Sequence, residues 1–305
     1  MKKHSPLIIL IFVLIPISNY ACEICGCGNG NFQIGLLPNF RKGFLGFRYS
    51  FSHFHSQLKT APTQFSNDYY QTMELWGGYN LKKLQIMTFM PYVISHKQSD
   101  DGITNLKGVG DLMVLLNYKI LESTSLSNNE KVTVRHELFL GGGIKLPTGF
   151  NKIDTSKPNF NIGDFNSQAG TGSIDYLLNA TYNLMWNRSG IITNVAHRIN
   201  STNQQEYRFG NRSYVNASYF YTFTKSNTTI KPNTGINYQN NSTNSFGGTK
   251  VENSNGYNVN STVGINILRN KFGINAMAFI PVAQNNYDGQ TKLKSRILFG
   301  ITYSF

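Results

Sequence analysis

The sequence predicts an all-β fold, a transmembrane antiparallel up-and-down β-barrel of about twelve strands. Three observations predict it: strict alternation in the last strand, a composition rich in aromatic residues but poor in charge, and strand candidates spaced along 43–305. A period of two gives a strand one apolar and one polar face, as a barrel surrounded by lipid requires.

The segment 291–305 alternates most regularly. One face carries Phe305, Tyr303, Ile301, Phe299, Ile297 and Leu293, interrupted by Ser295; the other carries Ser304, Thr302, Gly300, Leu298, Arg296, Lys294 and Lys292. A last strand that ends on an aromatic residue is similar to the signal read by the outer-membrane assembly machinery. We therefore expect that machinery as a partner, and a cationic stripe of Lys292, Lys294 and Arg296 on the lumen wall.

The N-terminus predicts export. Lys2 and Lys3 precede an apolar run at 7–17, which is too short for a transmembrane helix, and cleavage before Cys22 removes it. An uncleaved membrane anchor is the alternative. The predicted division is a signal peptide at 1–21, a Cys-containing periplasmic segment at 22–42 and an outer-membrane barrel at 43–305, in a Gram-negative cell.

The composition favours a barrel over a soluble domain. Aromatic residues make up 13% of the chain and charged residues only 14%, with a mean hydropathy of -0.28, whereas soluble domains average about 25% charged residues. The net charge of +13 falls to +11 without Lys2 and Lys3. An exported chain has little access to nucleic acid, so we expect the positive charge to meet anionic lipopolysaccharide or to line an anion-tolerant lumen.

Alternation and turn residues divide the mature chain into twelve strand candidates, with ten or fourteen as alternatives. They span 43–54, 68–81, 83–94, 108–121, 131–146, 170–186, 189–199, 207–224, 228–239, 256–268, 271–282 and 292–305. Tight connections at 81–83, 186–189, 225–227 and 268–271, with a longer one at 122–130, alternate with longer loops at 55–67, 95–107, 147–169, 200–206, 240–255 and 283–291. Short periplasmic turns and long outer loops are the asymmetry expected of an outer-membrane barrel.

Three glycine-containing motifs lie at predicted strand ends. They are Gly108-Val109-Gly110-Asp111, Lys145-Leu146-Pro147-Thr148-Gly149 and Gly170-Thr171-Gly172-Ser173-Ile174-Asp175. In this order they resemble the outer-membrane transporter barrels of the meta-pathway phenol-degradation family. The Cys-rich start, with Gly35-Leu36-Leu37-Pro38 and Gly46-Phe47-Arg48-Tyr49, resembles a Bacteroidetes branch of that family. The resemblance implies a porin-like transporter for a small hydrophobic or aromatic solute, and assigns no ligand role to any motif residue.

Cys22, Cys25 and Cys27 form a Cys-x-x-Cys-x-Cys cluster. Thiolates at this spacing can hold Zn or Cu(I), and the missing fourth ligand could come from His53 or His55, although the barrel separates them from the cysteines. A local disulfide with a spare thiol, or lipidation of Cys22, are the alternatives.

The sequence predicts no enzyme, because no histidine has a nucleophile at the spacing that an outer-membrane hydrolase requires. We expect a passive channel for small solutes, with a weakly anion-favouring lumen and the loop 147–169 folded toward the opening. The alternative is a barrel that anchors a metal- or redox-associated binding module built on the cysteines. The predicted lumen-lining residues are Arg48, Glu74, Asp111, Arg135, Glu137, Lys145, Asp175, Lys231, Lys294 and Arg296.

Overall fold

The computed structural model describes residues 42–59, 63–100, 102–126, 133–151, 153–156, 160 and 162–305. The predicted signal peptide and the three cysteines lie outside the described residues. Within the described residues, no helix is long and apolar enough to cross a membrane.

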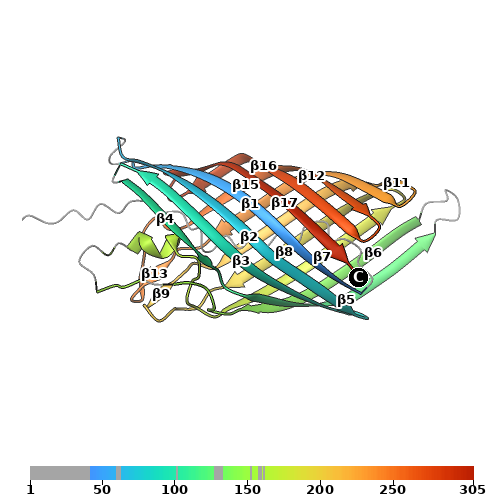
Figure 1. Ribbon diagram of the computed structural model, residues 1–305, viewed down its shortest axis with the longest axis horizontal. Helices are drawn as coiled ribbons and strands as arrows, with labels where there is room; N and C mark the ends of the chain where they lie inside the picture. The colour runs from blue at the N-terminus through green and yellow to red at the C-terminus, as the bar shows by residue number, and fades with distance from the viewer. Residues whose placement is uncertain are drawn as a thin grey trace, which may run out of the picture.

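Long antiparallel strands form a single closed barrel (Figure 1). They are β1 (Gly43–Gln57), β2 (Phe65–Leu81), β3 (Leu84–Ser99), β5 (Met113–Leu126), β6 (Thr133–Lys145), β7 (Asp175–Trp186), β8 (Ser189–Ile199), β10 (Arg212–Tyr221), β12 (Thr228–Asn241), β15 (Gly256–Arg269), β16 (Phe272–Asn286) and β17 (Thr291–Ser304). Two short strands, β4 (Gly102–Val109) and β11 (Phe223–Lys225), extend β5 and β10 beyond a break. Pairing of β1 with β17 closes the ring.

The predicted twelve-stranded barrel is therefore confirmed in the described part of the chain. Four hairpins have two-residue turns, and the first residue of each turn, Lys82, Asn187, Ser226 or Asn270, has a positive φ between 51° and 55°. Such turns match the right-handed twist of paired strands. These turns lie at the same end of the barrel as the C-terminus (Figure 1), so we call that end the turn end and the opposite end the loop end.

Several strands extend further toward the loop end than the alternation predicts. The predicted loop at 95–107 is largely paired strand, because β3 continues to Ser99 and β4 pairs with it in regular register. One strand differs in the opposite sense: the sixth strand was predicted to begin at 170, which is wrong, since β7 begins at Asp175. Strands are recognised in the sequence by alternation of apolar and polar residues. The strand ends near the loop end are mostly polar, so they lack this signal.

Two prolines explain the two strand breaks. Pro91 lies in the middle of β3, where Gly110 N donates to its carbonyl oxygen at 2.7 Å and the chain between β4 and β5 bulges inward at Asp111. Pro232 in β12 lacks the N–H that would continue the ladder to β10, and pairing of β12 with β10 ends at Asn233. A proline in a sheet is tolerated at such interruptions.

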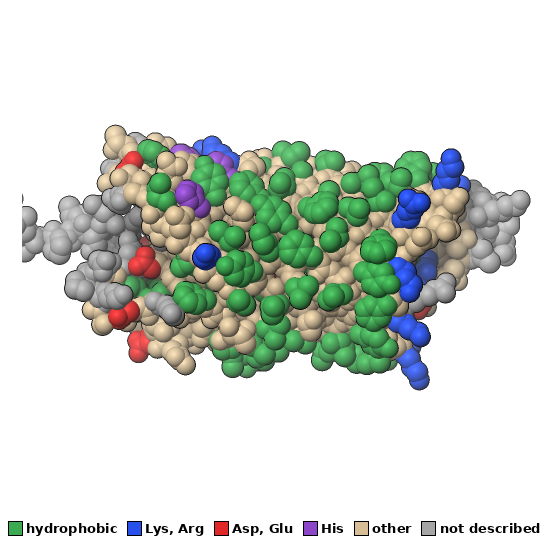
Figure 2. Space-filling model, in the orientation of Figure 1, with side chains coloured by type: hydrophobic (Ala, Val, Ile, Leu, Met, Phe, Trp, Pro, Cys, Tyr) green, Lys and Arg blue, Asp and Glu red, His purple; other side chains and the backbone are tan. Residues whose placement is uncertain are grey.

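The outer surface of the barrel is apolar, as the alternation predicts. Hydrophobic side chains cover the middle of the face in Figure 2, and Lys and Arg side chains lie at its turn end. In β17, Ile297, Phe299, Ile301 and Tyr303 are exposed while Leu298 and Thr302 are buried. This half of the strand follows the predicted faces.

The other half of β17 corrects the predicted cationic stripe. A β-bulge shifts the register between His53 and Phe54 of β1, so that Phe54 pairs with Leu293. Leu293 is 1% exposed and packs inside the barrel, whereas Lys292 and Lys294 are exposed. Lys294 therefore does not line the lumen, because one extra residue at a bulge reverses the face of every residue beyond it. Of the three predicted stripe residues, Arg296 alone faces inward.

Candidate functional site

A row of amide side chains crosses the inner wall of the barrel. Six buried asparagines lie along it: Asn117 and Asn179 flank Gly141 in the register of β5, β6 and β7, and Asn194, Asn216, Asn237 and Asn260 lie opposite one another from β8 to β15, two residues along the ladder from Asn179. Neighbours in this amide row bond to one another: Asn179 Nδ2 donates to Asn117 Oδ1 at 2.7 Å, and Asn260 Nδ2 donates to Asn237 Oδ1 at 3.3 Å. The row gives this wall a polar lining of donors and acceptors.

Some polar atoms of this wall have no hydrogen-bond partner among the described residues. They are Asn179 Oδ1, Asn194 Nδ2, Asn233 Oδ1, Asn260 Oδ1 and Thr262 Oγ1. Buried polar groups are almost always paired with protein or with water. The described residues therefore leave part of the hydrogen-bonding capacity of this inner wall unused.

Gly141 lies in the amide row between Asn117 and Asn179, and it provides a test of how tightly this wall is packed. A Cβ at Gly141 would lie 2.1 Å from Asn117 Oδ1 and 2.8 Å from Asn179 Oδ1. We expect Gly141→Ala to destabilise the barrel by about 1–3 kcal/mol, as overpacking does. The measurement is the urea midpoint of folding in detergent.

The adjacent Gly142→Ala variant is the matched control for Gly141→Ala. A Cβ at Gly142 would face outward and come no closer than 3.2 Å, to Leu177 O. Equal midpoints for the two variants would contradict the tight amide packing.

An apolar part of the inner wall adjoins the amide row, since Asn117 Nδ2 lies 3.7 Å from Met87 Sδ. Phe44, Trp76, Met87, Phe89, Met113, Leu115 and Leu177 form one buried cluster on β1, β2, β3, β5 and β7. Arg48 lies against this wall, with its guanidinium 5.3 Å from the Trp76 ring centre and its Nη2 hydrogen-bonded to Glu74 Oε1. The predicted inward positions of Arg48 and Glu74 therefore form one buried ion pair beside aromatic rings.

Arg296 is a buried lumen cation with neutral partners. Its Nε donates to Ser52 Oγ at 3.0 Å, its Nη1 donates to Gln239 Oε1 at 3.1 Å, and no carboxylate pairs with it in the described part of the chain. Lys231 lies 5.3 Å from the Phe220 ring centre; Glu137 attracts it electrostatically, but no ion pair joins it to a carboxylate among the residues described. These two residues place positive charge on the lumen wall.

Asp111, Lys145 and Asp175 form a buried ion triad where the three sequence motifs meet. Lys145 Nζ lies 2.6 Å from Asp111 Oδ2 and 3.0 Å from Asp175 Oδ2, and it also donates to Ser173 O at 3.0 Å. Asp111 accepts three further bonds: Oδ1 from Gly149 N at 2.9 Å, and Oδ2 from Thr171 N at 2.9 Å and Thr171 Oγ1 at 2.7 Å. The triad therefore fixes both ends of the loop between β6 and β7.

Two motif glycines let that loop close on itself. A Cβ at either Gly149 or Gly170 would lie 2.7 Å from the backbone of the other, and each would also crowd Asp111 Oδ1. Asn203 Nδ2 donates to Thr171 O at 3.0 Å and ties the next long loop to the same point. The motif residues thus have a structural role, in holding the loop inward.

A cap lies over the loop end of the barrel, built from the described parts of 146–174, 200–211 and 242–255. It contains the 3-10 helix η1 (Ile162–Ser167) and a small sheet of β9 (Tyr207–Arg208), β13 (Ser245–Phe246) and β14 (Thr249–Lys250). Its core is the cluster of Phe165, Tyr207 and Phe209, in which the Phe165 and Tyr207 rings stack at 4.0 Å. The prediction that loop 147–169 folds toward the opening agrees with this arrangement.

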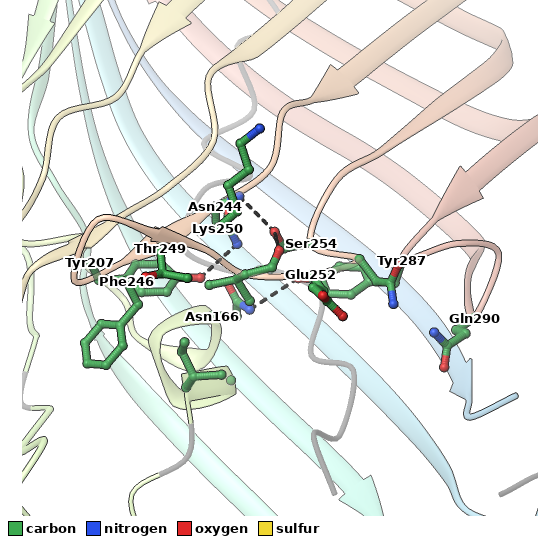
Figure 3. Close-up of a pocket in the computed structure, with 14 residues that line it drawn as sticks. Asn166, Tyr207, Asn244, Phe246, Thr249, Lys250, Glu252, Ser254, Tyr287 and Gln290 are labelled. Atoms are coloured by element: carbon green, nitrogen blue, oxygen red, sulfur yellow. Dashed lines mark hydrogen bonds between the residues drawn. The ribbon is translucent and has the colours of Figure 1, made fainter. Parts of the chain in front are cut away.

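A cavity of about 440 Å³ lies beside the cap (Figure 3). Tyr207, Phe246 and Val251 give it an apolar lining, and the polar groups of Asn166, Asn244, Ser254 and Tyr287 line the rest. Asn244 Nδ2 donates to Tyr207 Oη at 2.8 Å, and Asn166 Nδ2 donates to Tyr287 Oη at 3.3 Å. An apolar cavity with a few fixed polar groups has the lining of a site for a small organic molecule.

The remaining predicted lumen residues lie near the turn end. Glu137 is buried, and its Oε1 is 2.6 Å from Arg135 Nη2, which also bonds to the exposed Glu122 at 2.9 Å.

The two histidines considered as metal ligands, His53 and His55, alternate with buried residues of β1 and lie on its outer side. Among the described residues, no group of three or more His, Cys, Asp or Glu could hold a metal ion.

Comparisons with known proteins support the fold. No family model and no curated protein matches the chain. An outer membrane channel from Pseudomonas putida F1 is similar in structure, with 15% identity and a TM-score of 0.58 over 87% of this chain and 96% of that one. The β domain of the Bordetella autotransporter BrkA has 11% identity and a TM-score of 0.47, over 87% and 100% of the two chains. The Pseudomonas structure confirms the fold of an outer-membrane barrel.

Sequence reasoning missed the aromatic residues of the cap. Phe165, Tyr207 and Tyr287 lie in predicted loops or at a predicted strand start, and none was expected to form part of a cavity. The signal in the sequence is weak: three phenylalanines, Phe150, Phe160 and Phe165, in a loop that is otherwise rich in polar residues.

Proposed function

We propose that this chain is an outer-membrane channel for passive passage of small solutes, hydrophobic or anionic. The observation that carries the proposal is the lining of the lumen, in which a row of amide side chains adjoins an apolar cluster. A barrel that served only as an anchor would need neither unpaired amide groups nor unpaired cations on its inner face. Arg296 and Lys231 supply the attraction for anions.

Conductance in planar bilayers tests the channel directly. We expect ion conductance from the refolded protein, with a reversal potential under a salt gradient that indicates weak anion preference. Clear preference for cations would refute the anion-favouring lumen, and absence of conductance together with absence of solute flux would refute the channel.

The cavity beside the cap is the proposed first binding site for an apolar solute. Val251→Trp places a large ring in that cavity, and we expect it to slow uptake of small aromatic solutes into liposomes several-fold while ion conductance changes little. Val282→Trp is the matched control, because Val282 is exposed on the membrane-facing side of β16. Equal uptake by the two variants would remove the cavity from the solute path.

The three motifs support a relationship to the meta-pathway phenol-degradation transporters, and hence a small aromatic solute; the Cys-rich start with the segments 35–38 and 46–49 supports the Bacteroidetes branch. Growth of a deletion strain on a panel of aromatic and anionic carbon sources tests this substrate class. Selective loss of growth on aromatic compounds would support it, and unchanged growth on every compound would count against it.

The second candidate function uses the N-terminal cysteines as a metal- or redox-associated module for which the barrel is the anchor. Soft-metal chemistry of three closely spaced thiols supports it. Removal of residues 22–30, followed by measurement of bound Zn and Cu and of conductance, separates the two candidates. Loss of metal with full conductance would assign the cysteines a role separate from the channel.

A further inference from the structure

Histidine, asparagine and lysine side chains form a patch on the outer surface of the barrel near its loop end. Cross-strand register places His55 opposite Lys292 and Asn67, His53 opposite Tyr69, and His96 opposite Tyr69 and Asn105. We define the rim patch as His53, His55, Asn67, Tyr69, His96, Asn105, Lys107, Lys292 and Lys294. In Figure 2 histidine side chains lie on this part of the surface, toward the end away from the turn-end cations.

The rim patch carries positive charge, and Asp68, the carboxylate that attracts its His53 and His55, is buried on the inner side of β2. Lys107, Lys292 and Lys294 are exposed, and no Asp or Glu occupies a described outward-facing position of β17, β1, β2, β3 or β4. The nearby Lys59 is already paired, since its Nζ lies 2.5 Å from Asp288 Oδ2. The three lysines are therefore available to an external anion.

Hydrogen bonds and ring contacts hold the polar part of the rim patch in place. Asn67 Oδ1 lies 3.3 Å from His53 Nε2 and 3.0 Å from His55 Nδ1, so that both imidazoles donate to one oxygen. The His53 ring stacks on Tyr69 at 4.5 Å. His96 Nδ1 lies 2.5 Å from Asn105 Oδ1. An ordered set of polar groups loses little entropy when it binds a ligand.

The level of the rim patch on the barrel indicates what it meets. Toward the turn end most of the next outward positions are apolar or aromatic: Phe51, Ile94 and Ile297, with Gln71 of β2 between them, are followed by Tyr49, Tyr92 and Phe299. An aromatic and apolar belt of this kind lies in the membrane. Lysines just beyond it reach the polar headgroup layer, and long side chains such as that of Lys107 extend to it from within the belt.

We propose that the rim patch binds the phosphate groups of lipopolysaccharide in the outer leaflet. Three lysine ammonium groups match the anionic phosphates, and the histidines and amides provide further hydrogen-bonding groups beside them. The loop end faces outward because short turns face the periplasm. The inference rests on the proposed outer-membrane location and does not depend on solute passage.

The test compares two triple variants of the full mature barrel refolded in detergent. One is Lys107→Gln, Lys292→Gln and Lys294→Gln; the control is Lys83→Gln, Lys225→Gln and Lys271→Gln, which removes the same charge from exposed residues at the turn end. Binding of purified bis-phosphorylated lipid A, of its dephosphorylated form and of phosphatidylglycerol is measured by native mass spectrometry, and folding is checked by heat-dependent gel mobility.

We expect the wild type and the control to bind phosphorylated lipid A, and the rim variant to bind it at least about tenfold more weakly, since it lacks the three ammonium groups that attract the phosphates. Weak binding of the dephosphorylated form and of phosphatidylglycerol by all three proteins would support the assignment. Equal affinity of the rim variant and the wild type, an equal loss in the control, or undiminished binding of either other lipid would overturn it. Conductance of the rim variant is expected to stay at the wild-type level, which separates this result from a failure of the channel.

Discussion

Lys145→Met is expected to destabilise the barrel by about 3–5 kcal/mol and to raise its conductance. Lys145 is the cation of the ion triad, and its loss leaves Asp111 and Asp175 as two buried carboxylates without a counter-charge. Removal of one partner from a buried ion pair has a cost of this size. Because Asp111 also holds Gly149 and Thr171, the loop between β6 and β7 should leave its inward position. Urea titration in detergent measures the first effect, and single-channel recording measures the second.

Lys59→Met is the matched control for Lys145→Met. Lys59 also pairs with an aspartate, Asp288, but both side chains are more than half exposed, and such pairs contribute about 1 kcal/mol or less. The double variant Lys145→Met with Asp111→Asn should recover part of the lost stability, since it leaves one carboxylate without a cation in place of two. If Lys145→Met unfolded no earlier than Lys59→Met, the triad would not anchor the loop.

Arg296→Gln is expected to reduce the anion preference of the channel. Arg296 is buried on the lumen wall and is held by the neutral groups of Ser52 and Gln239, so no carboxylate in the described chain offsets its charge. A single charge acting across several ångström of the lumen contributes about 1 kcal/mol or less, which corresponds to a change of at most about fivefold in the anion-to-cation permeability ratio. Reversal potentials under a potassium chloride gradient measure that ratio.

Arg269→Gln is the control for Arg296→Gln, because Arg269 is exposed at the end of β15, beside a tight turn. It should leave the reversal potential close to that of the wild type. A shift as large in Arg269→Gln as in Arg296→Gln would assign the preference to the overall charge of the protein, and no shift in Arg296→Gln would remove that residue from the ion path.

The Lys145 and Arg296 variants test different parts of the proposed path. The ion triad controls the position of the loop at the outer opening, whereas Arg296 acts on ions inside the barrel. We expect Arg296→Gln to change selectivity at normal conductance, and Lys145→Met to raise conductance. Both results together would show that an ion passes first the cap and then the lumen wall on a single path.

The strand pattern of this chain is readable from its sequence because each strand separates lipid from the lumen. Phe299 and Ile301 face lipid, whereas Arg296 and Thr302 face inward. Because successive side chains of a strand point to opposite faces, apolar and polar residues alternate along the sequence. The four tight turns are readable for a similar reason, since short polar connections interrupt the alternation. The polar strand ends, such as β4, carry no such signal.

The ionic residues of the lumen were identified in the sequence, but their partners were not. Arg48 and Glu74 were each predicted to line the lumen, and the structure pairs them across the neighbouring strands β1 and β2. Lys145, Asp111 and Asp175 come from three motifs separated by up to 64 positions, and their convergence depends on the inward bulge at Asp111 and the loop closure at Gly149 and Gly170. Contacts of this kind depend on loop conformation, which hydrophobic periodicity does not encode.

By itself the sequence determined the barrel, its strand number and the face that most residues occupy, because lipid on one side and water on the other impose alternation on every strand. The tertiary structure decided which charges meet, that Lys292 and Lys294 lie outside, and that cap aromatic residues enclose a cavity. Each of these depends on a single bulge, proline or loop closure that changes register or direction locally, and such changes are determined by contacts between segments far apart in the chain.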